Sequence, residues 1–240
     1  MNNNNKKVFH NWATLLKYGN ATLNIKLWTS EKHLLKKYIK QSATILDLGC
    51  GSGRTTFALY ENGYQNIIAA DISEAMIEQA NWINQKLNYP IDFQVQDATN
   101  LKFQDNQFDF VFFSFNGWPG IPSQKARIKA LSEIYRVLKK GGIFIFSAHE
   151  RDEEKYLANY KKVLNECNEF KFETFGDYIF KNEENFCDFM HLYSLEELKN
   201  LILSNTKFKI LETLNRDQNF KESNEVLKFS DNTIFWILQK

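Results

Sequence analysis

The sequence is poor in the residues that mark disulfide-rich, metal-binding and linker-rich proteins. It has 3 cysteines and 3 prolines among 240 residues, and no two cysteines have the C-x-x-C spacing of a zinc or redox site. Because Cys50, Cys167 and Cys187 are odd in number, a disulfide framework is not indicated. We therefore expect reduced thiols, a cytoplasmic location and no metal site.

Long apolar runs and an excess of one charge are also missing. No run of about 18 apolar residues occurs, and residues 1–7 hold four asparagines and two lysines instead of an apolar signal region. The expectation is a chain without a membrane span or a visible export signal. The formal net charge is +1, so no global field favours nucleic acid or an anionic membrane.

One stretch organises the rest of the chain. Residues 44–54 hold an apolar run that includes Asp47, followed by Gly49, Gly51 and Gly53 at alternate positions. This pattern predicts a buried parallel strand, a tight turn and a helix over 54–61. Backbone at such a strand end can approach a small ligand, and the next helix offers free N–H groups. A dinucleotide fingerprint would need glycine at position 54, where this chain has arginine.

Strand and helix patterns alternate after this stretch, which predicts an α/β fold built as one domain. Strands are expected over 66–71, 91–96, 108–114, 143–148, 208–214 and 233–239. Helices are expected over 73–87, over 125–140 with Gly141 and Gly142 as its stop, and over 194–204. The polar stretch 215–228 indicates a mobile loop.

The order of these motifs resembles the class I S-adenosylmethionine-dependent methyltransferases. Residues 47–53 match the family's first motif, whose glycine turn holds the methionine end of the cofactor, and residues 130–142 resemble a later one. The resemblance covers about residues 44–148. It implies a doubly wound, mostly parallel seven-stranded sheet with an antiparallel C-terminal strand, helices on both faces, N-terminal helices and a cap insert.

Two further acids follow expected strands in the order of that family. Asp71 lies 22 positions after Gly49 (71 − 49), close to the spacing at which an acid reaches both hydroxyls of a ribose. The resemblance implies that Asp97 holds the adenine amino group while Ala98 leaves room for the ring. The implied cofactor is S-adenosylmethionine, with S-adenosylhomocysteine as product. The expected cofactor-binding residues are Asp47, Gly49, Cys50, Gly51, Asp71, Ile72, Met76, Asp97, Ala98 and Ser114.

Candidates for the methyl-accepting side follow the strands that end at Ser114 and Ala148. Asn116 and Trp118 are the expected substrate contacts, although turn formation in their proline-containing loop also accounts for them. His149 is the candidate catalytic base, because an unperturbed imidazole pKa of about 6.5 leaves it mostly neutral. A structural histidine is the plainer alternative.

Aromatic segments flank the expected core at 44–148. Residues 1–43 are expected to form an N-terminal helical cover with a helix over 30–40, in which Trp12, Tyr18 and Trp28 either anchor the helices or form a lid. Residues 150–193 are the expected cap, with a helix over 152–168 and a hairpin that turns near 182–184. Residues 194–240 complete the domain with a helix and a strand pair.

The predicted function is methyl transfer to an oxygen or nitrogen atom, and the neutral charge and aromatic cap favour a small-molecule acceptor. The chain lacks the Asn-Pro-Pro-Tyr-like tetrad and the Pro-Cys nucleophile of DNA-methylating enzymes, so DNA is not expected. An RNA or protein substrate stays open. Two other classes also remain, an NAD(P)-dependent oxidoreductase on the same sheet and a noncatalytic methyltransferase-like partner protein.

Overall fold

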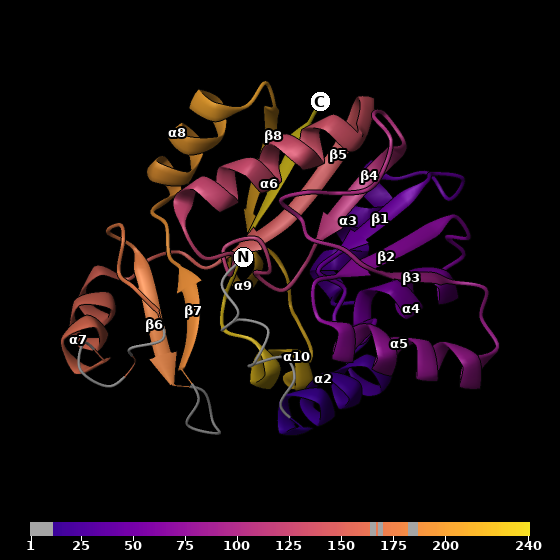
Figure 1. The fold of residues 1–240 in the computed structure, drawn as a ribbon, viewed down its shortest axis with the longest axis horizontal. Coiled ribbons are helices and arrows are strands. Elements are labelled where there is room, and N and C mark those ends of the chain that lie inside the picture. Colours follow the sequence, from indigo (N-terminus) through magenta and orange to yellow (C-terminus); the bar gives the residue numbers. More distant parts are fainter. Residues whose placement is uncertain (1–11, 164–166, 168–169, 182–186) are drawn as a thin grey trace.

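The computed structural model describes residues 12–163, 167, 170–181 and 187–240. Its main sheet has seven strands in the order β3-β2-β1-β4-β5-β9-β8 (Figure 1). The strands are β1 (Ile45–Leu48), β2 (Ile67–Asp71), β3 (Asp92–Val95), β4 (Phe108–Phe113), β5 (Leu138–Ala148), β8 (Lys209–Asn215) and β9 (Ile234–Gln239). β1 to β5 pair in parallel, whereas β9 runs antiparallel to both β5 and β8. The predicted fold class is confirmed.

The central strands are apolar on both faces because helices cover both. On one face, Phe110 and Phe112 of β4 pack in a cluster with residues of α3 (Thr29–Tyr38) and α4 (Arg54–Glu61). On the other, Val111 and Phe113 pack with α6 (Gln124–Val137) and α8 (Leu195–Asn205). α5 (Glu74–Leu87) covers β2 and β3 beside α4. This two-sided burial is why these strands read as continuous hydrophobic runs.

Serine caps fix two of the predicted helix starts. Ser73 accepts a hydrogen bond from the Met76 backbone N–H at 3.3 Å, and α5 begins at the next residue. Ser194 and Glu197 form the predicted capping box of α8. The starts of α5 and α8 are therefore set by local sequence.

Two sequence-based expectations about local structure are wrong. The helix expected over 125–140 ends at Val137, and β5 starts at Leu138 and runs through both glycines that were expected to stop the helix. The expected mobile loop 215–228 instead contains α9 (Arg216–Asn219) and begins α10 (Asn224–Phe229), capped by Asn215 and Ser223. Burial of Arg216 and Val226 against the core holds this polar segment in place.

The cap is a small unit with its own core. It comprises α7 (Glu153–Val163) and a hairpin of β6 (Asp177–Lys181) and β7 (Cys187–His191), which stands beside the main sheet (Figure 1). The predicted hairpin is confirmed, while its expected turn at 182–184 lies outside the described residues. Its core consists of Val163, Cys167, Phe170, Ile179 and Phe189.

Hydrogen bonds and ion pairs join the cap to the main domain at its base. The Arg151 backbone N–H donates to the Tyr193 carbonyl at 2.9 Å, and the Arg151 guanidinium forms a two-pronged pair with Glu197 at 2.7 and 3.0 Å. The buried Arg127 of α6 donates to the Tyr193 hydroxyl at 2.8 Å. Two-pronged arginine pairs are geometrically specific, so the base of the cap is fixed in orientation.

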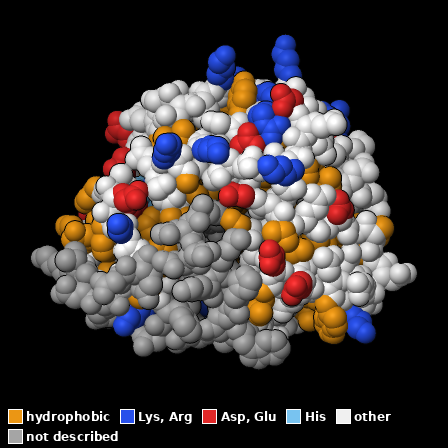
Figure 2. Space-filling view, in the orientation of Figure 1, with side chains coloured by type: hydrophobic (Ala, Val, Ile, Leu, Met, Phe, Trp, Pro, Cys, Tyr) orange, Lys and Arg blue, Asp and Glu red, His pale blue; other side chains and the backbone are white. Residues whose placement is uncertain are grey.

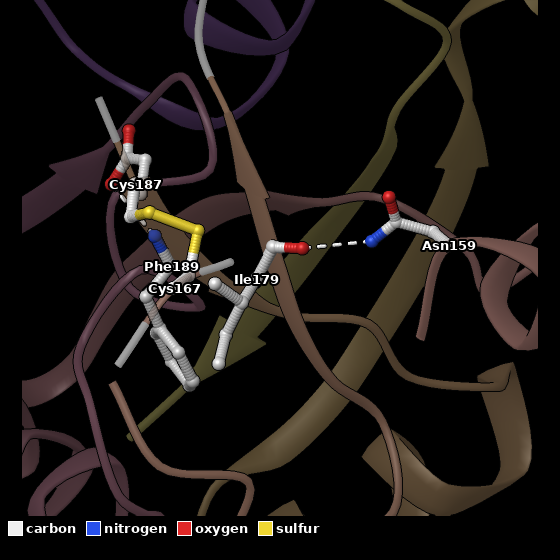
Figure 3. The surroundings of a disulfide bond; sticks show 6 residues. Asn159, Cys167, Ile179, Cys187 and Phe189 are labelled. Atoms are coloured by element: carbon white, nitrogen blue, oxygen red, sulfur yellow. Dashed lines mark hydrogen bonds between the residues drawn. A yellow bond between two sulfur atoms is a disulfide. The ribbon is translucent and has the colours of Figure 1, made fainter. Parts of the chain in front are cut away.

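A disulfide joins Cys167 and Cys187 inside the cap, across a sequence separation of 20 residues (Figure 3). The expectation of reduced thiols is therefore wrong for this pair and holds for Cys50, which is free and buried. The cysteine count could not reveal the bond, because only the packing of the hairpin brings the two side chains together. Within the described residues, no helix has both the length and the apolar character needed to cross a bilayer.

The disulfide gives a direct chemical prediction. Alkylation of the unfolded protein without reductant should label one cysteine, and alkylation after reduction should label three. Reduction should also speed hydrogen exchange in β6 and β7, because a cross-link closing a loop of this size stabilises by about 3 kcal/mol. The double variant Cys167→Ala/Cys187→Ala is the control, since reductant should leave its exchange unchanged. Three labels without reductant would contradict the bond.

Candidate functional site

The glycine turn, residues 49–53, connects β1 to α4 at the carboxyl edge of the sheet. Gly49 and Gly51 have φ angles of +66° and +55°, which favour glycine. A Cβ on Gly49 would lie 2.2 Å from a ring carbon of Phe113, so this glycine allows β4 to pack closely. A Cβ on Gly51 would meet only the Tyr18 ring, at 4.0 Å. The open side of the turn therefore lies at Gly51, below Tyr18.

Asp47 holds the glycine turn to the helix that follows it. Its side chain is 0% exposed, and its Oδ2 accepts hydrogen bonds from the hydroxyls of Thr55 and Thr56 at 2.5 and 2.6 Å. Its Oδ1 is buried without a partner among the described residues. Burial raises the pKa of the Asp47 carboxyl to about 6, against the opposing effect of the two hydroxyls. Asp47 is thus fully enclosed beneath the glycine turn, which it ties to the start of α4.

Asp71 ends β2 and connects the glycine turn to α5. Its Oδ2 accepts from the Gly51 backbone N–H and its Oδ1 from the Ser73 backbone N–H, both at 2.9 Å. Burial raises the pKa of this carboxyl, although the backbone donors oppose the shift. Each oxygen keeps a second lone pair, so a pair of hydroxyls can still bind. Ile72 follows it half-buried, and Met76 is buried in the first turn of α5.

Asp97 lies just beyond β3, on the same edge of the sheet. Its Oδ1 accepts from the backbone N–H and the hydroxyl of Thr99, both at 2.8 Å, and no described residue bonds to its Oδ2. Ala98 is buried beside it. Because β1, β2 and β3 are parallel neighbours, Gly51, Asp71 and Asp97 come together in the predicted order. Cys50 is buried within the turn as a neutral thiol, since burial raises its pKa.

The β4 loop, residues 114–123, forms the next wall of the edge. Phe115 and Asn116 have φ angles of +51° and +56°, in the left-handed region that bulky side chains rarely adopt. The Phe115 ring stacks on Phe229 of α10 at 4.7 Å between centroids and meets Tyr18 edge-on at 6.0 Å. Ser114, an expected cofactor contact, is buried, and its carbonyl accepts from the Gly117 N–H at 3.2 Å.

His149 and Asn116 form a connected hydrogen-bond network. The Asn116 amide Nδ2 donates to His149 Nε2 at 2.9 Å, and its Oδ1 accepts from the Thr233 hydroxyl at 2.8 Å. Because His149 Nδ1 lies 2.7 Å from the Asn232 carbonyl, it must carry the ring proton. Burial lowers the pKa of His149, with Arg216 acting in the same direction, while the Asn232 carbonyl and Asp231 oppose the shift. The imidazole is therefore held neutral in one tautomer.

The structure does not bring Trp118 to this edge as a substrate contact. Its side chain is 0% exposed, and its indole N–H donates to the Arg127 carbonyl at 3.0 Å. Its ring stacks on Tyr193 at 5.8 Å. Full burial leaves no surface for an acceptor, so Trp118 serves the core at the base of the cap.

The N-terminal helices reach the site from outside the sheet. Trp28 is buried between Phe115 and Phe235, with the guanidinium groups of Arg54 and Arg216 each 5.1 Å from its ring centroid. Trp28 is thus an anchor. Tyr18, on α2 (Trp12–Asn24), instead faces the glycine turn, and Thr22 and Ser52 share a hydrogen bond of 2.9 Å. The side chain of Trp12 lies outside the described residues.

Sequence reasoning missed several residues that build this site. Thr55 and Thr56 bind Asp47, and Phe229 is the last residue of α10, directly after the segment 215–228 that was expected to be a loop. Thr55 and Thr56 follow the glycines in the predicted helix 54–61, so their position near Asp47 could have been predicted. No local signal in the sequence connects Phe229 to the end of a strand more than 100 residues earlier. Within the described residues, no three His, Cys, Asp or Glu side chains gather as a metal site.

Comparisons with known proteins agree with this geometry. Residues 45–142 match the family model described as a methyltransferase domain. The chain is 30% identical over 164 residues to a demethylmenaquinone methyltransferase of Staphylococcus haemolyticus, covering 67% of this chain and 64% of that protein. It is 36% identical over 118 residues to an eEF1A lysine and N-terminal methyltransferase of Xenopus laevis, covering 47% of this chain and 17% of that protein.

A solved structure shows the same fold. The crystal structure of a SAM-dependent methyltransferase from Methanosarcina mazei has a TM-score of 0.68 and 21% identity, over 86% of this chain and 96% of that one. The matched part of the chain covers less than two thirds of the length of each of the two curated relatives described above. Together the matches agree with the resemblance: residues 45–142 carry a methyltransferase domain, and the fold is the one that the solved S-adenosylmethionine-dependent methyltransferase has.

The open side of the glycine turn can be tested with a matched pair of glycines. Gly51→Ala should weaken S-adenosylhomocysteine binding at least about ten-fold in calorimetry, because its methyl group fills the space below Tyr18. Gly141→Ala is the control, since Gly141 also has a positive φ (+80°) but no atom within 4 Å of an added Cβ. Each variant should lose about 1 kcal/mol of stability from backbone strain. Equal affinities in the two variants would contradict a ligand at Gly51.

Proposed function

We propose that this protein is an S-adenosylmethionine-dependent methyltransferase that transfers a methyl group to an oxygen or nitrogen atom of a small molecule. The observation that carries the proposal is the convergence of Gly51, Asp71 and Asp97 at one sheet edge, each with acceptor capacity or space left over. The methyltransferase domain at residues 45–142 agrees with this assignment.

Different residues of the sheet edge would bind different parts of the cofactor. Gly49, Cys50 and Gly51, with Asp47 beneath them, would hold the methionine end, and Asp71 would bind the ribose hydroxyls. Asp97 and Ala98 would receive the adenine, flanked by Ile72, Met76 and Ser114. When bound, the cofactor supplies an activated methyl group on a sulfonium ion.

The chain's own contribution to catalysis is positioning and exclusion of water. Holding two reactants in line can lower a barrier by roughly 7 to 11 kcal/mol, whereas a positioned base contributes about 10² to 10⁴ in rate. We propose that residues 1–43 and 150–193 cover the core at 44–148 from two sides. Tyr18 packs edge-on against Phe115, and the buried Arg127 holds the base of the cap through the Tyr193 hydroxyl, which supports such a cover.

We propose that His149 accepts the proton from the acceptor and that Asn116 orients it. The imidazole is neutral and its Nδ1 proton is held by the Asn232 carbonyl, which leaves Nε2 as the basic nitrogen. In the structure Nε2 already accepts from the Asn116 amide, so a substrate hydroxyl or amine must displace that donor. Trp118 is not included in the acceptor site, because it is fully buried.

Several observations favour a small molecule over a nucleic acid. Basic and acidic side chains are interspersed over the described part of the face in Figure 2, without a continuous basic stripe. The relatives act, by their names, on demethylmenaquinone and on a protein, so both classes of acceptor occur among them. An oxidoreductase is disfavoured, because position 54 carries an arginine that pairs with Glu31. A noncatalytic partner protein is the remaining alternative.

Cofactor binding separates these alternatives. Calorimetry should detect S-adenosylhomocysteine and no NAD, and labelled cofactor incubated with a metabolite extract should yield a labelled small molecule if the protein is a catalyst. Tight binding of S-adenosylhomocysteine without transfer to metabolites, RNA or protein would instead support the noncatalytic class. Binding of NAD alone would overturn the proposal.

The ribose contact has a specific test. Asp71→Ala should lower S-adenosylhomocysteine affinity ten-fold or more, since each hydrogen bond to a charged acceptor contributes about 1.5 to 3 kcal/mol. Asp92→Ala, at the exposed start of β3, is the control and should bind as the unmodified protein does. An unchanged affinity in the Asp71 variant, with its fold intact by circular dichroism, would remove this residue from the site.

The role of His149 predicts a pH effect with a definite sign. Its pKa is lowered from 6.5, so the base is competent above that lowered value and activity should fall only as pH drops through it. His149→Gln should reduce turnover roughly 10²-fold and leave S-adenosylhomocysteine affinity near that of the unmodified protein. It should also abolish the acid limb of the pH–rate profile, which is the fall in activity at low pH. Turnover within a few-fold of normal, with the limb retained, would show that alignment alone suffices.

A further inference from the structure

The cap hairpin turns one face away from its own core. Ile179 of β6 and its partner Phe189 of β7 are buried in the cap core, at 0% and 4% exposure. Successive strand residues alternate between faces, so the opposite face carries different side chains. This inner face consists of the half-buried residues Tyr178, Phe180, Asp188 and Met190.

The inner face borders the methyl-accepting side of the site. The His191 backbone N–H of β7 donates to the Pro119 carbonyl of the β4 loop at 3.0 Å. The Phe189 carbonyl lies 3.9 Å from the position of a Cβ on Gly120. Since Asn116 belongs to the same loop, β7 runs beside the residues that face His149.

Asp188 is the charged group of this face, and no cation neutralises it. Its Oδ1 accepts from the Phe189 backbone N–H at 2.8 Å, but it has no ion-pair partner in the part of the chain that the structure describes. Burial raises the pKa of its carboxyl. A partly desolvated carboxylate without a counter-ion is costly, and a ligand cation would offset that cost.

The charge of Asp188 reaches the ring that covers the glycine turn. The pKa of the Tyr18 hydroxyl is raised, first by burial and then by Asp188 and Asp71, while Arg54 acts in the opposite direction. The strand β7 also lies beside the β4 loop through the His191–Pro119 hydrogen bond, and Phe115 of that loop contacts the Tyr18 ring above Gly51.

Aromatic rings cluster beside the β4 loop and the glycine turn. Tyr18 meets Phe115 and Phe229 edge-on at 6.0 and 6.4 Å, and Phe115 stacks on Phe229. The three rings come from α2, the β4 loop and α10, and all are partly exposed. Ring faces attract cations within about 6 Å, and most strongly where water is excluded. A carboxylate together with aromatic rings is the combination that recognises an organic ammonium group.

We propose that the methyl acceptor is an organic amine, whose ammonium group is bound by Asp188 and packs against the Tyr18 and Phe229 rings. The inference rests on the proposed methyltransferase function and specifies nitrogen rather than oxygen as the acceptor atom. The ammonium loses one proton to His149 Nε2, the base proposed above, and the nitrogen lone pair then forms a bond to the methyl carbon. The carbon–sulfur bond breaks, its electron pair stays on sulfur, and the products are a methylammonium and a neutral thioether.

The test compares probes of equal shape and different charge. Phenethylamine, 2-phenylethanol and phenylacetate, and an alkyl series with the same three end groups, are titrated in calorimetry into protein saturated with S-adenosylhomocysteine. At least one amine should bind about ten-fold or more tightly than its alcohol and acid counterparts. Asp188→Asn should abolish that preference, and Glu154→Gln, which removes an exposed carboxylate from the same cap, should keep it.

The outcomes distinguish failure of the amine site from failure of the proposed methyltransferase function. If S-adenosylhomocysteine binds but no amine is preferred, or if Asp188→Asn retains the preference, the amine inference is overturned and the methyltransferase proposal stands. If S-adenosylhomocysteine does not bind the unmodified protein, the proposed function itself fails. Tighter binding of a lysine peptide than of every small amine would overturn the small-molecule assignment and retain the ammonium site. Asp188→Asn must bind S-adenosylhomocysteine normally, which shows that it is folded.

Discussion

The buried ion pair between Arg54 and Glu31 is the interaction on which the rest of the site depends. Arg54 is the first residue of α4 after the glycine turn, and its guanidinium forms bonds of 2.8 and 2.7 Å with the two oxygens of Glu31. It also donates to the Lys26 carbonyl, while Glu31 accepts from the Trp28 N–H. Breaking a buried pair by removing one partner typically costs 3 to 5 kcal/mol. The pair thus ties the N-terminal cover to the turn that it covers.

The sheet was predictable because its signals are local. Apolar runs closed by Asp71 and Asp97, and serine caps before α5 and α8, need no knowledge of distant residues. The same holds for the family resemblance at residues 44–148. Predictions from local sequence were wrong where contacts between residues far apart in the chain determine the structure. Arg216 and Val226 order a polar segment by burial. Trp118, which was expected to contact substrate or to form a turn, packs in the core against Phe146 and Tyr193.

The two halves of the site therefore differ in origin. The proposed cofactor half is built from the ends of successive strands, and short sequence motifs predict it. The proposed acceptor half combines α2, the β4 loop, α10 and the cap hairpin, which meet in the described residues through aromatic contacts and hydrogen bonds across the chain. Such contacts leave no periodic trace in the sequence. Under the proposed function, single substitutions on the cap would change acceptor specificity while the cofactor edge stays the same.

The position of β9 has a consequence for the order in which the protein can form. β9 lies between β5 and β8, although it follows both in sequence, and residues 234–238 are buried. During synthesis β8 therefore leaves the ribosome before a strand exists beside which it can pair. Until β9 arrives, the apolar edge of β5 stays open, and Thr233 cannot yet bind Asn116. The hydrogen bond that holds Asn116, and with it the proposed acceptor side of the site, therefore forms only after β1, β2 and β3 have been synthesised.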